Sequence, residues 1–227
     1  MNNTITQLGL MFIFLVGISL LLLFIELLYR RLELKGEYTR KLAHFTGTLS
    51  TITFPYIFES HFYVLAMALF FFLVLFISRN NTYLRSIHDI DRISAGSYFL
   101  PAAIYITYLI ADKADSMLLF ILPMLILAIC DPAAGIMGIN LQQYNHKIKL
   151  FGHELQKTWL GSLTFFVSCF IISIVALYFN QMHLGLRIFE ISALIAFVTA
   201  IVEMLSWKGS DNLFIPLSAL GVLMLFL

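Results

Sequence analysis

The sequence predicts an all-α membrane protein that crosses the bilayer several times. Of its 227 residues 60% are hydrophobic and only 12% are charged, and the mean hydropathy is +0.91. A soluble domain of this size carries roughly twice as much charge. Apolar runs long enough to span a bilayer recur along the chain. The two cysteines, Cys130 and Cys169, lie inside such runs and therefore indicate neither a disulfide framework nor a metal site.

A membrane-spanning helix needs about 20 mostly apolar residues, and eight ranges approach this length. These ranges are 7–28, 42–58, 62–78, 95–111, 117–138, 159–179, 187–205 and 212–227. The second and the eighth are short or polar, so seven spans is the alternative. Because no soluble domain fits between them, we expect residues 1–227 to form a single membrane domain. The range 7–28 is too long for a signal-peptide core, so we expect a retained helix that is peripheral to a motif-bearing core, 40–216.

Basic residues are concentrated in alternate loops. Twelve of the 14 Lys and Arg residues fall in the first, third, fifth and seventh loops: Arg30, Arg31, Lys35, Arg40, Lys41, Arg79, Arg85, Arg92, Lys147, Lys149, Lys157 and Lys208. The other loops contain only Lys113 and Arg187. The positive-inside rule then places the basic loops in the cytoplasm and both termini on the non-cytoplasmic side. This asymmetry favours an even count of eight.

The segment "CDPAAGIMG", residues 130–138, interrupts an apolar run with an acid and a proline. Asp131, Ala134, Gly135 and Gly138 are spaced i, i+3, i+4, i+7 and therefore share one helix face. A strip of small residues is typical of helix packing, but packing alone leaves Asp131 unexplained. An acid within the bilayer costs about 2.5–3.5 kcal/mol, so we expect Asp131 to face a polar cavity.

Pro132, directly after this acid, has no backbone N–H. We therefore expect the helix to loosen locally. The loosening would free the carbonyl group of Leu127 or Ala128 from its usual hydrogen bond.

A second segment, "TRKLAHFTG", places Arg40, His44 and Gly47 at i, i+4, i+7, with Lys41 adjacent. Basic residues at a helix end commonly extend toward the interface, and a lone histidine is often a structural hydrogen bonder. These structural roles are the alternative to phosphate binding by Arg40 and Lys41 and to catalysis by His44.

A third segment, "GHELQKTWLGS", contains a Lys–Thr pair but lacks the glycines of a phosphate-binding P-loop. Lys157 and Gly161 are spaced i, i+4, and Ser162 follows. A lysine that enters a span beside Gly and Ser could still bind phosphate.

A fourth segment, "VEMLSWKGSDNLFIP", contains Glu203, Asp211 and Asn212. Capping the following helix is the alternative role for Asp211. It does not account for Glu203, which lies inside a predicted span. A weaker fifth segment, "SAGSYFLPAA", opens the fourth span.

The polar residues of these segments fall near the cytoplasmic ends of their spans. The hard oxygens of Asp131, Glu203 and Asp211 suit Mg²⁺ (or Mn²⁺) bridged to phosphates. The side chains of Arg40, Lys41 and Lys157 suit the phosphates themselves. Phosphoryl transfer needs mainly positioning and charge neutralisation, so this inventory predicts a site where a soluble anion meets a membrane-dissolved substrate.

Five segments carry a family resemblance: "RKLAHFTG", "GSYFLPAA", "DPAAGIMG", "KTWLGS" and "EMLSWKGSDNLFIP". In this order they resemble the polyprenol kinase family, which includes dolichol kinase, phytol kinase and the CTP-dependent diacylglycerol kinase of yeast. The resemblance implies transfer of the γ-phosphate of a nucleoside triphosphate, often CTP, to the hydroxyl group of a lipid alcohol. That alcohol would be a polyprenol, a phytol-like alcohol or a diacylglycerol. The choice among CTP, ATP and UTP stays open. We expect no nucleic-acid partner, and the sequence leaves the oligomeric state open.

The candidate site residues divide by expected role. The catalytic candidates are Asp131, Lys157, His44 and Glu203, and the metal candidates are Asp131, Glu203 and Asp211. The nucleotide- and phosphate-binding candidates are Arg40, Lys41, Lys157, Thr158, Gly161, Ser162, Gly135, Gly138 and Asn212. Which group accepts the hydroxyl proton, His44 or one of the acids, stays open.

The sequence departs from the family at Leu160, where the family motif has Glu; Glu154 is a candidate replacement. The nearest alternative function is a phosphatidate cytidylyltransferase. Those enzymes share the Asp-x-x-Ala and Lys-Thr elements, but their C-terminal Pro-Gly-His-Gly-Gly signature is absent here. A membrane transporter is a third reading, against which stand the absence of a visible repeat and the gathering of polar residues at one face.

Overall fold

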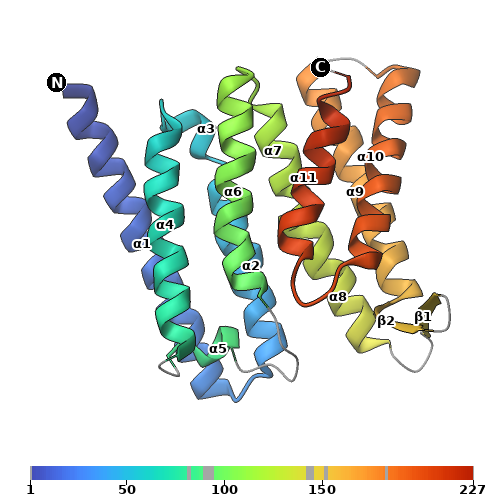
Figure 1. The fold of residues 1–227 in the computed structure, drawn as a ribbon, viewed down its shortest axis with the longest axis horizontal. Helices are drawn as coiled ribbons and strands as arrows, with labels where there is room; N and C mark the ends of the chain where they lie inside the picture. Colours follow the sequence, from blue (N-terminus) through green and yellow to red (C-terminus); the bar gives the residue numbers. More distant parts are fainter. Residues whose placement is uncertain are drawn as a thin grey trace.

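The computed structural model describes residues 2–80, 83–88, 95–141, 146–150, 153–181 and 184–226. Its helices run side by side and roughly parallel, with both termini at the same end of the bundle (Figure 1). The elements are α1 (Asn2–Leu32), α2 (Gly36–Thr51), α3 (Phe54–Ile57), α4 (His61–Asn80), α5 (Arg85–His88), α6 (Gly96–Lys113), α7 (Leu118–Leu125), η1 (Ile126–Cys130), α8 (Asp131–Asn140), β1 (Lys147–Leu150), β2 (His153–Thr158), α9 (Trp159–Gln181), α10 (Leu186–Leu205) and α11 (Asp211–Leu223).

Helices occupy each of the eight ranges that the sequence predicts to span. Helices α2 and α3 share the second range, and α7, η1 and α8 form one continuous segment over the fifth. Within the described residues, five segments are long and apolar enough to cross a membrane: α1, α4, Leu118–Asn140, α9 and α10. Helix α11 is apolar but shorter. The structure thus agrees with a helical, multi-pass membrane protein.

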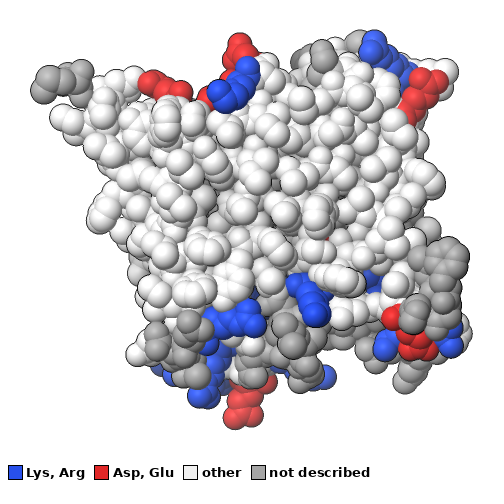
Figure 2. All heavy atoms as spheres, viewed as in Figure 1, with Lys and Arg blue, Asp and Glu red and all other residues white. Residues whose placement is uncertain are grey.

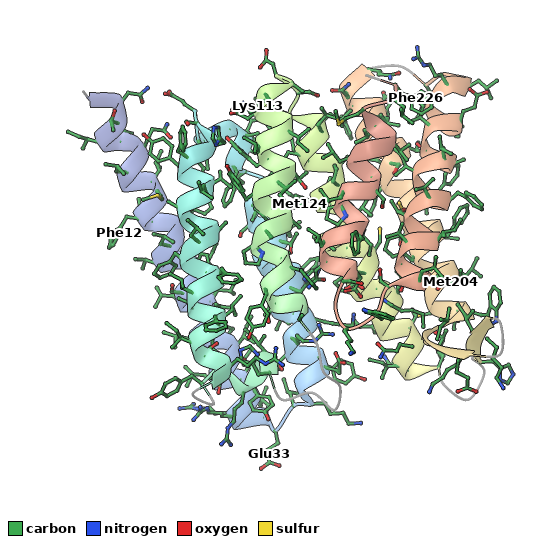
Figure 3. The ribbon with its side chains drawn as sticks, in the orientation of Figure 1. Phe12, Glu33, Lys113, Met124, Met204 and Phe226 are labelled. Carbon is green, nitrogen blue, oxygen red and sulfur yellow. The ribbon has the colours of Figure 1, made fainter. Side chains whose placement is uncertain are left out.

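On the face of the bundle drawn in Figure 2, charged side chains gather at the two ends and the middle is almost free of them. Exposed apolar side chains such as Leu69 of α4, Ile171 of α9 and Phe197 of α10 lie near the middles of their helices. A surface of this kind on a helical bundle indicates contact with lipid. We call the end that carries Arg30, Lys149 and the β1–β2 hairpin the basic end. Figure 3 shows Glu33 at the basic end and Lys113 at the opposite end. Arg92, predicted for the basic end, lies outside the described residues.

The buried core is largest where α7, η1, α9, α10 and α11 pack together. Phe120, Phe165 and Ile195 are fully buried there. Tyr108 of α6 packs edge-on against Phe120 and donates its hydroxyl hydrogen to the carbonyl oxygen of Phe58 at 2.7 Å. This contact joins α6 and α7 to the end of α3, while α1 lies at the edge of the bundle (Figure 1).

The segment before Asp131 is a π-helix, Ile126–Cys130. Pro132 follows two residues later and contributes no backbone N–H. The predicted local loosening of the helix is therefore confirmed. Short π segments of this kind often occur at functional sites.

The β1–β2 hairpin replaces what the sequence suggested was the approach to a spanning helix. The strands are antiparallel, Lys147 pairs with Thr158, and the register is irregular between Lys147 and Lys149. Helix α9 begins only at Trp159, so Lys157 lies on a strand and not at a helix start. The expected i, i+4 helical relationship between Lys157 and Gly161 is wrong for this reason.

Candidate functional site

A polar cleft of about 380 Å³ opens at the basic end between α2, α8, β2, α9, α10 and α11. Ten of the thirteen site residues predicted from the sequence line it: Arg40, Lys41, Asp131, Gly135, Gly138, Lys157, Thr158, Gly161, Glu203 and Asp211. Segments that are far apart in the sequence therefore meet at one place in the fold.

The ammonium group of Lys157 occupies the centre of the cleft. Its Nζ lies 2.8 Å from Oε1 of Glu203, 3.0 Å from Oδ2 of Asp211 and 3.9 Å from Oδ1 of Asp131. Three carboxylates from α8, α10 and α11 thus converge on a single cation delivered by the end of β2.

The second oxygen of each carboxylate has its own partner. The hydroxyl of Ser162 donates to Oε2 of Glu203 at 3.0 Å. The backbone N–H of Asn212 donates to Oδ1 of Asp211 at 3.1 Å, and Asp211 is the first residue of α11, where the helix dipole favours an anion. These partners hold the carboxylates in fixed orientations.

Lys41 is the second cation of the cleft and depends on a glycine. Its Nζ lies 3.6 Å from Oδ2 of Asp131 and donates to the carbonyl oxygen of the same residue at 3.4 Å. A Cβ atom added to Gly135 would fall on Nζ and Cε of Lys41. Gly135 therefore provides the space in which the lysine reaches the aspartate.

The other two glycines of the cleft lie beside Thr158. A Cβ on Gly138 or on Gly161 would come within 3.0 Å of Oγ1 of Thr158, and one on Gly161 would also approach the carbonyl oxygen of Ala134 at 3.1 Å. The Thr158 hydroxyl accepts a hydrogen bond from the N–H of Gly161 at 3.2 Å. The small residues thus allow α8, α9 and the strand end to pack closely, as the packing alternative predicts for them.

The charged side chains of the cleft are largely buried. Glu203 is 2% exposed and Asp131 is 8% exposed. Buried charges are tolerated only where they are paired. Three carboxylates face two ammonium groups here, which leaves one negative charge in the cluster. Burial alone lowers the pKa of Lys157, but the carboxylates of Asp211, Glu203 and Asp131 outweigh it and raise that pKa above its ordinary value. The lysine is therefore protonated at neutral pH.

The predicted metal ligands fit a cation in their chemistry but not in their present arrangement. Asp131, Glu203 and Asp211 supply hard oxygens, which Mg²⁺ prefers. The point where they converge is filled by Nζ of Lys157. Within the part of the chain that the structure describes, no three His, Cys, Asp or Glu side chains are placed to hold a metal ion.

A second cavity, which we call the apolar crevice, adjoins the cleft between α1, α2, α4 and α6. Arg40 lines both cavities and pairs with Glu37 at 2.8 Å. His44 and Asn212 line the crevice and not the cleft, and the amide of Asn212 donates to the carbonyl oxygen of Gly96 at 2.8 Å. The structure thus separates these two residues from the other predicted phosphate-binding residues.

Glu154, the candidate replacement for the Glu that the resemblance leads one to expect in place of Leu160, does not line the cleft. Glu154 pairs with Lys149 across the hairpin at 3.3 Å, and its side chain is 53% exposed. Sequence reasoning also missed three polar residues that line the cleft: Glu37, Lys147 and Gln156. The spacing of Glu37, three residues before Arg40, was the available signal for one of them.

Comparison with protein-family models, with curated proteins and with solved structures found no match for this chain. The functional proposal below therefore rests on the geometry of the cleft and on the order of the five sequence motifs.

Proposed function

We propose that this protein is a membrane lipid-alcohol kinase. It would transfer the γ-phosphate of a nucleoside triphosphate, CTP being the expected donor, to the hydroxyl group of a lipid alcohol. The observation that carries the proposal is the meeting of a charged cleft and an apolar crevice at Arg40, inside one membrane-type bundle. At such a junction the donor could react from the aqueous phase while the chain of the lipid acceptor stays in the bilayer.

The proposed orientation follows from charge. The basic end would face the cytoplasm, because Lys and Arg are retained preferentially on that side. Both termini lie at the opposite end and would be non-cytoplasmic (Figure 1). The cleft would then open to the compartment that supplies nucleoside triphosphates.

The cations of the cleft suit a triphosphate. Lys41, Lys157 and Arg40 line the same cleft, and each is now paired with a carboxylate. Phosphoryl transfer depends mainly on positioning and charge neutralisation, so in the proposed reaction these cations would exchange carboxylate oxygens for phosphate oxygens. The carboxylates that now surround Lys157 keep it protonated and in place. Mg²⁺ or Mn²⁺ stays a prediction of the sequence.

The reaction requires one bond exchange and one proton transfer. The hydroxyl oxygen of the lipid forms a bond to the γ-phosphorus while the bond from that phosphorus to the β–γ bridging oxygen breaks, and the nucleoside diphosphate leaves with the electron pair. We propose His44 as the acceptor of the hydroxyl proton, because His44 lines the crevice that would hold the lipid.

The decisive assay uses purified protein in lipid nanodiscs with nucleotide labelled at either the γ- or the α-phosphorus. Lipid alcohols and phosphatidate are offered as acceptors. Label from the γ-position in an alcohol supports the kinase. Label from the α-position in phosphatidate identifies a cytidylyltransferase instead, and no label in any lipid rejects both enzymes.

A further inference from the structure

The apolar crevice is long and narrow. On α4 it is lined by residues at helical spacing: Val64, Ala68, Phe71, Leu75 and Arg79. They form one face of the helix, and at 1.5 Å per residue they extend over about 22 Å. The volume of the crevice is about 160 Å³, less than half that of the polar cleft. So small a volume beside such a length of α4 describes a narrow slot and not a wide chamber.

The polarity of the crevice changes along its length. Arg40, His44 and Asn212 line it near the basic end, where it adjoins the cleft. Toward the opposite end its walls are apolar, and Phe54 lies there at the start of α3. A slot that is polar at one end and apolar over the rest matches a molecule with one polar group and one apolar chain.

Gly47 of α2 leaves part of this slot open. It lines the crevice, and a Cβ atom added to it would have no atom outside its own helix turn within 4 Å. The space beside its Cα is therefore free to accept part of a ligand, or a larger side chain in a variant.

We propose that the apolar crevice binds the chain of a single-chain membrane alcohol. Its hydroxyl group would lie at Arg40 and His44, and its chain would run along α4 toward Phe54. The role of the hydroxyl rests on the proposed function, whereas chain binding rests on the crevice alone. The length of about 22 Å exceeds the roughly 15 Å of one leaflet, which favours a long chain of the isoprenoid or fatty-alcohol type. A diacylglycerol would leave its second chain outside the slot.

The test is photo-crosslinking in nanodiscs without nucleotide. The probe is a long-chain alcohol that carries a diazirine at mid-chain, and labelled peptides are mapped by mass spectrometry. We expect label on the crevice face of α4, at Phe71 and Leu75. We expect Gly47→Phe, which fills the slot, to reduce this labelling by at least about tenfold, because several methylene groups lose their burial.

A matched control is Gly221→Phe. Gly221 also has open space around it, but it lies exposed on α11 and outside the crevice. This variant should label like the unmodified protein, and thermal unfolding of both variants in nanodiscs reports whether they fold. An excess of unlabelled single-chain alcohol should compete with the probe, and diacylglycerol should compete much less.

The outcomes separate the crevice from the kinase. Crevice labelling that Gly47→Phe removes, without any phosphate transfer, supports the crevice and rejects the kinase. Phosphate transfer with labelling that is spread over the outer faces of α1 and α4 and unchanged by Gly47→Phe overturns the crevice while the kinase stands. Equal competition by diacylglycerol overturns the choice of a single-chain ligand.

Discussion

The imidazole of His44 on α2 donates a hydrogen bond from Nε2 to the carbonyl oxygen of Leu127, at 3.2 Å. Leu127 lies in the π-helical segment η1, where its carbonyl group would accept from the N–H of residue 132, and Pro132 has no N–H. The proton on Nε2 leaves Nδ1 as the ring nitrogen with a free lone pair. One hydrogen bond therefore satisfies a carbonyl that the proline has freed and fixes the tautomer of a histidine that lines the crevice.

His44→Gln and His44→Leu should separate these two roles. Glutamine can still donate to the Leu127 carbonyl but cannot accept the hydroxyl proton, so we expect the turnover rate to fall about 10²- to 10⁴-fold with little loss of stability. Leucine also leaves the carbonyl unpaired, which should cost about 1–3 kcal/mol of unfolding free energy. Phosphate-transfer rates and denaturant unfolding measure the two effects. Unchanged turnover in His44→Gln would exclude His44 as the base.

The helices were predictable because their signal is strong. Long apolar runs and the residues that interrupt them located all eight ranges, and Pro132 after Asp131 located the irregular turn. The spacing of Asp131 and Gly135 correctly indicated that these two residues lie on the same face of a helix.

Asp131→Asn should abolish phosphate transfer while the protein stays folded. Asparagine keeps the shape but removes the charge that pairs with Lys41 and lies near Lys157. Without that charge the two ammonium groups lose part of what holds them in position, and we expect turnover to fall at least about a hundredfold. The rate is measured with γ-labelled nucleotide, and circular dichroism confirms the helical fold. Full activity in this variant would remove Asp131 from the mechanism.

Gly135→Ala should displace Lys41. The added methyl group would fall on the end of the lysine side chain, which is flexible and can move away, so we expect weaker nucleotide binding in a folded protein. Gly221→Ala is the matched control, since an added methyl group there meets open space. Nucleotide affinity can be measured by equilibrium binding. If both variants bind alike, the close approach of Gly135 to Lys41 has no bearing on the nucleotide.

The position of Lys157 was not predictable from local pattern. Its segment "HELQKT" is short and carries no clear sequence signal for a strand. Nor does this segment indicate that the strand ends beside three carboxylates from other helices. The sequence indicated that Lys157 and the acids belong to one site, but it assigned a metal ion to the point that the lysine occupies. That arrangement depends on contacts between residues 26 to 54 positions apart, which periodicity does not encode.

Lys157→Met should destabilise the protein and weaken nucleotide binding. Removing the cation leaves three carboxylates facing one another in a buried site, which we expect to cost about 3–5 kcal/mol of unfolding free energy. Lys149→Met is the control, because Lys149 forms an exposed ion pair with Glu154 that should contribute no more than about 1 kcal/mol. Denaturant unfolding and the Michaelis constant for the nucleotide test both expectations. An unchanged nucleotide dependence in Lys157→Met would exclude contact between Lys157 and phosphate.

The stabilising effect of Lys157 should not change with pH near neutrality. The carboxylates, chiefly that of Asp211, outweigh the effect of burial and raise the pKa of Lys157 above its ordinary 10.5. A folded-state pKa above the unfolded value gives a stabilisation that is complete below the unfolded pKa and is lost only as the pH rises through the folded one. The difference in unfolding free energy between the unmodified protein and Lys157→Met should therefore stay constant from about pH 7 to pH 9. Parallel denaturant titrations at several pH values measure it, and a difference that shrinks across this interval would show that the lysine loses its proton inside the cleft.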